Sequence, residues 1–133
     1  MNNSRVIKKP KKSKSLKKQC DALLRELCLL RAQNKSELSG KSDETLQVHH
    51  IVGKPNLFLR YLLDNCIVLT AGGEHFYGVH NPNREEHYRS LIKSVRGEDI
   101  YKRLEQYKQL HTKSDIFLIK FYLEQEIKKL KNT

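Results

Sequence analysis

No run of apolar residues in this sequence approaches the roughly 18 that a membrane-spanning helix requires. The N-terminus carries Lys and Arg residues, but no apolar segment follows them as it does in a secretory signal. Both absences argue against an integral membrane protein and against a secreted one. We therefore expect a cytoplasmic protein without a membrane partner.

Cysteine is also scarce, with three residues at Cys20, Cys28 and Cys66. An odd number at spacings of 8 and 38 residues fits neither a disulfide framework nor a CxxC metal knuckle. Free cysteine packs like a small hydrophobic side chain, and the first two cysteines share an apolar helix face with leucines. We expect reduced thiols in the core.

Acidic residues are outnumbered, with 15 Asp and Glu against 26 Lys and Arg, which gives a net charge of +11. A polyanion, in the first place nucleic acid, is the partner that this charge favours. Residues 1–18 contain no acidic residue, and repulsion among their lysines predicts a disordered basic arm. The arm is either a solvated tail or a clamp on phosphates, with candidate contacts at Lys8, Lys9, Lys11 and Lys12.

The length of 133 residues leaves room for a single core. We place that core at residues 19–112, between the basic arm and a C-terminal helix at 113–133. This last helix is apolar over more than one face in its first half. Such a wide face favours docking across the domain or a homodimer.

Hydrophobic periodicity predicts the α+β fold class. Apolar residues at 3.6-residue spacing predict helices over 15–34, 85–96, 98–110 and 114–131. Short apolar runs predict two strands, at 46–51 and 66–69. We expect a glycine turn at Gly72 and Gly73 to follow the second strand.

Four of the six histidines fall within the 32 residues from His49 to His80, in the unit of the two predicted strands and the turn. Imidazole has an unperturbed pKa near 6.5, so it can act as a general base at neutral pH, and its neutral nitrogen ligates divalent metals. Hydrolysis of a phosphodiester uses both properties, because it needs an activated water and a Lewis acid. The cluster is therefore a candidate for a hydrolytic metal site.

Adjacent residues of a regular strand point to opposite faces of a sheet. His49 and His50 can therefore share one site only at a strand end or a bulge. Gly53 and Pro55 follow shortly afterwards and are consistent with a strand that ends at the doublet.

The histidines belong to three segments, Val48-His49-His50-Ile51, Asp64-Asn65-Cys66-Ile67-Val68-Leu69, and Glu74-His75 with His80. Together these segments resemble the HNH nuclease motif, a ββα-metal hairpin plus helix. The likeness is greatest to phage recombination nucleases of the NinG (Rap) type. Their recurring elements correspond here to His49-His50-Ile51, Arg60-Tyr61, Asp64-Asn65 and His80-Asn81-Pro82. The resemblance covers residues 20 to about 105.

The resemblance implies a role for each matching residue. His49 and His75 become metal ligands, His50 the general base that takes a proton from water, and Asn65 the residue that fixes the loop beneath His50. His80 is the candidate third ligand, although that ligand in HNH proteins often lies four residues after the second and His80 lies five after His75. The alternatives for the third ligand are Asn81 and Glu74.

Many relatives hold a structural zinc with two CxxC pairs. The matching positions here are Ser36, Ser39, Thr70 and Gly73. Ser and Thr do not replace thiolate on zinc, so we expect no structural zinc and a fold that helix packing stabilises. Matching these four positions to the relatives places Glu74 where their helix histidine is expected. A one-residue insertion in the glycine turn would bring His75 to that position instead.

The resemblance implies an HNH endonuclease, which is a divalent-metal-dependent hydrolase of DNA phosphodiester bonds. It further implies a role in phage recombination or DNA processing, with branched DNA as one candidate substrate. One divalent ion is expected, with Mg²⁺ or Mn²⁺ favoured by availability and Zn²⁺ by imidazole ligands. A phage-encoded protein would act in the cytoplasm of its bacterial host. The candidate phosphate contacts near the site are Lys54, Arg60, Arg84 and Arg89. Two other functions stay open, a catalytically inactive HNH-fold DNA-binding protein and a basic RNA-binding protein.

Overall fold

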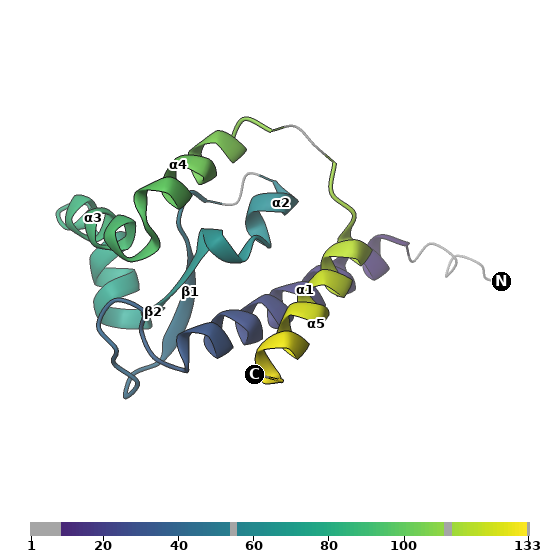
Figure 1. Cartoon of the computed structure of the whole chain (residues 1–133), viewed down its shortest axis with the longest axis horizontal. Coiled ribbons are helices and arrows are strands. Elements are labelled where there is room, and N and C mark those ends of the chain that lie inside the picture. The colour runs from purple at the N-terminus through teal and green to yellow at the C-terminus, as the bar shows by residue number, and fades with distance from the viewer. Residues whose placement is uncertain (1–8, 54–55, 111–112, 133) are drawn as a thin grey trace.

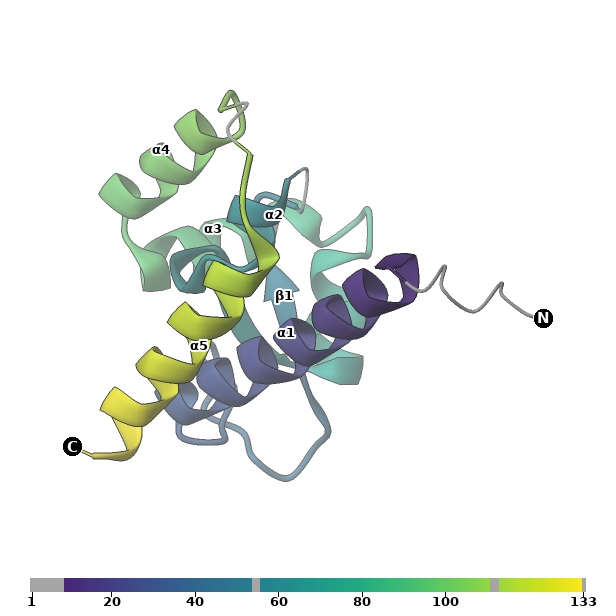
Figure 2. The same ribbon diagram turned by 90° about the vertical axis from the view of Figure 1, so that its right-hand side faces the viewer.

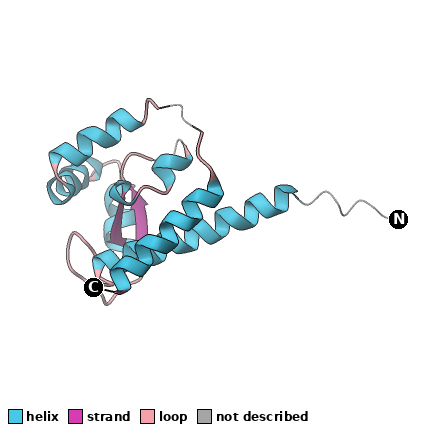
Figure 3. Ribbon diagram, turned by 45° about the vertical axis from the view of Figure 1, so that its right-hand side comes forward, coloured by secondary structure: helices cyan, strands magenta, loops and turns pink. Residues whose placement is uncertain are grey.

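The computed structural model describes residues 9–53, 56–110 and 113–132, and side chains from residue 15 onward. Helices surround one two-stranded antiparallel hairpin, as Figure 3 shows by secondary structure. The described chain is thus a mixture of helices and a hairpin, which is consistent with the predicted α+β class.

The hairpin pairs β1 (Leu46–His50) with β2 (Cys66–Thr70). The register runs from Leu46 opposite Thr70 to His50 opposite Cys66. All five residues of β2 are buried, whereas β1 is partly exposed, so β2 is the central strand of the core. Both predicted strands are confirmed to within one residue, and His50 is the last residue of its strand, as the doublet required.

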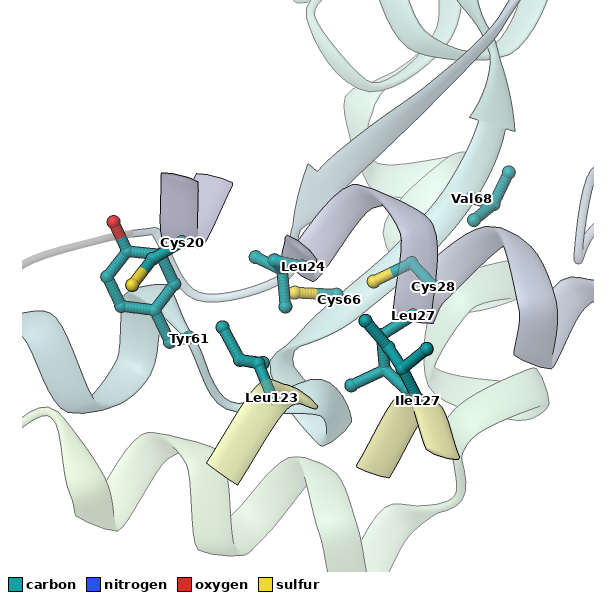
Figure 4. Packing of buried hydrophobic residues seen from close by; sticks show 9 residues of the cluster. All are labelled: Cys20, Leu24, Leu27, Cys28, Tyr61, Cys66, Val68, Leu123 and Ile127. Atoms are coloured by element: carbon teal, nitrogen blue, oxygen red, sulfur yellow. The ribbon is translucent and has the colours of Figure 1, made fainter. Parts of the chain in front are cut away.

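Two long helices, α1 (Lys9–Ala32) and α5 (Ile116–Lys131), pack side by side across the hairpin in Figures 1 and 2. They close the main core with residues of the hairpin and of the connecting segment. Figure 4 shows the buried members, Cys20, Leu24, Leu27, Cys28, Tyr61, Cys66, Val68, Leu123 and Ile127. All three cysteines are buried free thiols, as expected.

This packing explains part of the wide apolar face of α5. Leu123 and Ile127 are buried against α1, in agreement with docking across the domain. The opposite side of α5 exposes Phe117, Leu118 and Phe121. The homodimer stays a prediction.

The first helix begins earlier than the sequence predicted. α1 starts at Lys9, so residues 9–18 are helical and not a disordered arm, while residues 1–8 lie outside the described part. Lysine is a good helix former, and proline at position 10 costs no hydrogen bond because the first turn has no intrahelical acceptor for its missing N–H. The helix that packs on α5 therefore extends continuously to Lys9.

The segment between the strands contains two short helices, α2 (Leu57–Arg60) and η2 (Leu63–Asn65). After β2 the chain forms η3 (Ala71–Val79), then α3 (Glu85–Arg96) and α4 (Glu98–Tyr107). Ile67, Leu69 and Ile92 form a second, smaller core between β2 and α3. Positive φ at Gly97 allows the sharp turn between α3 and α4.

A partly buried ion cluster joins α1, the loop after it, β2 and α3. Arg31 and Arg96 both pair with Glu37, whose side chain is 11% exposed. Both guanidiniums also donate to the carbonyl of Cys66, at 2.6 and 3.0 Å. Since β2 begins at Cys66, the cluster fixes the start of the central strand.

Among the described residues, no helix combines the length and the apolar character that crossing a membrane requires.

Candidate metal centre

Three histidine side chains converge beside the hairpin. His49 comes from β1, His75 from η3, and His80 caps the C-terminal end of η3. Their candidate ligand nitrogens all lie within 4.8 Å of one another, close enough to bind one metal ion. The three residues that the sequence singled out as ligands are thus neighbours in space, and the ring centroids lie 4.6 to 5.5 Å apart.

The five-residue spacing of His75 and His80 is explained by η3, which is a π-helix. In an α-helix with 3.6 residues per turn, side chains five apart point about 140° away from each other. A π-helix closes each turn with an i→i+5 hydrogen bond, and here the amide of His80 donates to the carbonyl of His75 at 3.1 Å. The wider turn brings the two imidazoles to the same side of the helix.

This π-helix corrects the expectation of a glycine turn after the second strand. Gly72 and Gly73 belong to the first part of η3. The five-residue spacing of His75 and His80 is therefore accommodated by the wider helical turn. Thr70 caps the helix, and its hydroxyl accepts from the amide of Glu74 at 3.1 Å.

Hydrogen bonds prepare the ring of His75 to ligate an ion. Nδ1 lies 2.5 Å from Oε1 of Gln47, an acceptor, so Nδ1 carries the hydrogen and Nε2 the lone pair. Nε2 of His75 lies 3.0 Å from Nε2 of His80. Two nitrogens that each lie about 2.1 Å from one ion are separated by about 3.0 Å at a right angle and about 3.4 Å at a tetrahedral angle. The observed separation fits two ligands of one ion.

The environment favours the neutral form of His49 and His75. Burial, together with repulsion from His75, His80 and His50, lowers the pKa of His49 to about 4. Burial and then His80 lower the pKa of His75 below its usual value. A neutral imidazole is the form that ligates metals, so at neutral pH neither His49 nor His75 needs to lose a proton before it binds a cation.

His50 faces the same hollow as the three clustered histidines. The hollow has a volume of about 280 Å³ and is lined by Val48, His49, His50, Gly53, His75 and His80. Nε2 of His50 lies 2.8 Å from the carbonyl oxygen of Arg60. Because a carbonyl only accepts, Nε2 carries the hydrogen, and Nδ1 is the nitrogen with the lone pair. In this tautomer Nδ1 is the nitrogen that can accept a proton.

Asn65 lies under the loop that follows His50. Its Oδ1 accepts from the amide of Val52 at 3.0 Å, and its Nδ2 donates to the carbonyls of Gly53 and Leu59 at 3.1 and 2.9 Å. The side chain is fully buried, so these bonds are well shielded from water. Asn65 therefore ties the end of β1 to α2.

Glu74 and Asn81, the alternative third ligands, point elsewhere. Oε1 of Glu74 accepts from the hydroxyl of Ser36 at 2.6 Å and from the amide of Thr70 at 2.8 Å. Oδ1 of Asn81 accepts from the amide of Asn83 at 2.9 Å, within the turn after η3. His80 is thus the third member of the cluster by geometry.

Ser36 and Thr70, two of the positions that the resemblance assigned to zinc ligands, meet around the Glu74 carboxylate. The Ser36 hydroxyl oxygen also accepts from the amides of Leu38 and Ser39, both at 3.1 Å. Burial raises the pKa of Glu74, but hydrogen bonds from Ser36, Thr70 and Ser39 outweigh it and lower the pKa overall. The hydrogen-bonded carboxylate of Glu74 thus joins the segment around Ser36 to the end of β2 at Thr70.

The chain matches no family model, no curated protein and no solved structure.

The basic residues proposed to contact phosphates differ in whether they lie near the histidine cluster. Arg89 pairs with Glu85 at 2.9 Å and lines a second hollow, of about 210 Å³, that shares His49 with the first. Arg84 is exposed just before α3. The guanidinium of Arg60 binds Asp21 and does not line the histidine hollow. Lys8 and Lys54, and the side chains of Lys9, Lys11 and Lys12, lie outside the described residues.

Sequence reasoning missed two residues that support the site, Gln47 and Asp21. Gln47 was detectable, because it precedes His49 by two residues and so shares its face of the strand. Asp21 lies 39 residues before its partner Arg60 in the sequence. Only the tertiary fold brings the two together, and no local pattern indicates it.

Proposed function

We propose that this chain is a divalent-metal-dependent HNH endonuclease that hydrolyses DNA phosphodiester bonds. The observation that supports the proposal most is the common hollow of His49, His50, His75 and His80. A hydrolytic site needs a cation position and a general base next to each other. In this hollow, His49, His75 and His80 offer the cation position, and His50 offers the general base.

The donor set suits a divalent transition metal. Three neutral imidazole nitrogens favour Mn²⁺, Zn²⁺ or Ni²⁺ over Mg²⁺, which prefers oxygen ligands. A divalent ion held by His49, His75 and His80 would supply Lewis-acid stabilisation of the charge that develops on the phosphate. Gln47 would hold His75 in the ligating tautomer through Nδ1.

The chain's own residues account for the proton transfer. His50 takes a proton from water at Nδ1, while its Nε2 hydrogen stays bonded to the carbonyl of Arg60. That bond stabilises the imidazolium that forms. Asn65 holds the loop and α2 in place, so that the ring and its carbonyl acceptor keep their relative position.

The charge of the chain supports DNA as the substrate. The excess of 11 positive charges favours a polyanion, and Arg89 lies at the rim of the hollow that adjoins His49. Phosphate contacts of this kind position a duplex without reading its sequence. A role in phage recombination, and branched DNA as substrate, are proposed from the family resemblance.

Supercoiled plasmid and a four-way DNA junction should be incubated with purified protein and Mn²⁺, Mg²⁺, Zn²⁺ or EDTA. We expect cleavage that requires a metal, and its loss in His50→Ala with unchanged DNA affinity. His87→Ala is the matched control, because His87 is an exposed histidine of α3 outside the cluster. DNA binding without cleavage under every metal condition, or equal cleavage by His50→Ala, would contradict the proposal.

A further inference from the structure

The carbonyl of Arg60 is a structural support for His50, since it accepts the Nε2 hydrogen at 2.8 Å. It is available because Arg60 is the last residue of α2, and carbonyls at a helix C-terminus have no partner within the helix. The direction in which the His50 ring points therefore depends on how firmly the end of α2 is held.

α2 is too short to be stable on its own. It has four residues, with a cap bond from Asn56 and backbone bonds that link Arg60 to Asn56 and Tyr61 to Leu57. Isolated helices of this length are unstable in water, because nucleation costs more than one turn of hydrogen bonds returns. Contacts from other elements must fix its orientation.

Asp21 of α1 makes the contact at this end of α2. Its carboxylate accepts from Nε and Nη2 of Arg60 at 3.1 and 2.9 Å, which is a bidentate pair. Oδ1 also accepts from the hydroxyl of Tyr61 at 2.8 Å. Burial and this hydrogen bond raise the pKa of Tyr61 to about 12, so the hydroxyl stays a donor at neutral pH.

Asp21 is itself firmly placed. It follows Cys20, which is fully buried, and lies three residues before Leu24, which is 3% exposed. Both belong to the core between α1 and α5. Asp21 thus connects a rigid helix to Arg60 and Tyr61, and through the Arg60 carbonyl to the ring of His50.

We propose that Asp21 is a positioning residue, which holds Arg60 and Tyr61 so that the Arg60 carbonyl keeps the His50 ring in one orientation, with its Nε2 hydrogen bonded. The catalytic meaning of this role rests on the proposed nuclease function, whereas the orientation of the ring can be tested without it.

The test uses Asp21→Asn, which keeps the size of the side chain but removes its charge. Arg60→Lys is a second variant, since lysine keeps the charge but cannot form the bidentate contact. The matched control is Glu26→Gln, which removes another ion pair of α1, the one with Lys131 at 3.0 Å. Nitrogen-15 spectra of the His50 ring in metal-free protein report the tautomer, and cleavage kinetics report kcat and KM separately.

We expect wild type and Glu26→Gln to show one Nε2-protonated tautomer of His50, and both Asp21→Asn and Arg60→Lys to show an averaged mixture. The two variants should lower kcat about tenfold with little change in KM, and the double variant should be no worse than either. Retention of the single tautomer in Asp21→Asn and Arg60→Lys would overturn the inference. If wild type cleaves no DNA, the proposed function fails, while the ring spectra still decide whether Asp21 positions His50.

Discussion

Replacing Glu74 by alanine removes the carboxylate around which Ser36 and Thr70 meet. The substitution leaves two buried donors, the Ser36 hydroxyl and the Thr70 amide, without the acceptor that they have at 2.6 and 2.8 Å. Each unsatisfied buried group costs about 1–3 kcal/mol, so for the two donors we expect a loss of about 2–6 kcal/mol in the free energy of unfolding. For a domain of this size, such a loss is a large part of the total stability.

Glu74→Gln separates the role of the charge from that of the shape. The amide oxygen can still accept a hydrogen bond, so we expect a smaller loss, of about 1–2 kcal/mol. Urea unfolding followed by circular dichroism measures both variants against wild type. Equal stability of Glu74→Ala and wild type would refute the reasoning, because it would mean that water or neighbouring groups satisfy both donors.

The same carboxylate predicts a pH dependence of stability. The pKa of Glu74 in the folded protein lies below its ordinary value of 4.5. A group with a lowered pKa in the folded state contributes stability that is complete above the unfolded pKa and is lost as the pH falls through the folded pKa. The difference in unfolding free energy between wild type and Glu74→Gln should therefore shrink below about pH 4.5. A difference that is constant down to acid pH would contradict the lowered pKa.

Three further changes test other parts of the structure. Glu37→Gln leaves two partly buried guanidiniums, those of Arg31 and Arg96, without their carboxylate, and should lower the free energy of unfolding by about 3 kcal/mol in urea. Gln47→Ala removes the acceptor of the Nδ1 hydrogen of a ligand histidine and should weaken Mn²⁺ binding about tenfold by calorimetry, with unfolding unchanged. Gly78→Ala would place a methyl group 2.8 Å from the ring of Tyr88, which must move, at about 1 kcal/mol of stability. For each variant, a measured value equal to that of wild type would contradict the effect expected for it.

The strands and the histidine cluster were predictable because their signals are local. The alternation of Leu46 to His50 and the apolar run of β2 indicate strands directly. His49, His75 and His80 could be grouped because a hairpin followed by a helix brings segments about 30 residues apart together. The π-helix was not predictable, since nothing in residues 71–79 distinguishes an i→i+5 turn from a glycine turn.

The supports of the site were missed because they depend on long-range packing. Arg60 carries a charge that suggests phosphate binding, but α1 presents Asp21 to it, and a bidentate ion pair takes up the guanidinium. Glu74 beside His75 suggested a ligand, but its carboxylate turns toward the buried Ser36. In both cases the partner lies 38 or 39 residues away in the sequence, so local patterns carried no information about it.

The proposed function requires that His49, His75 and His80 bind one divalent ion in the hollow that His50 faces. The most direct measurement is a calorimetric titration of metal-free protein with Mn²⁺ or Zn²⁺, alongside His75→Ala, His80→Ala and the control His87→Ala. We expect binding of a single ion by wild type and His87→Ala, and loss of that binding in the other two variants. Absence of binding in wild type, or equal affinity in all four proteins, would contradict it.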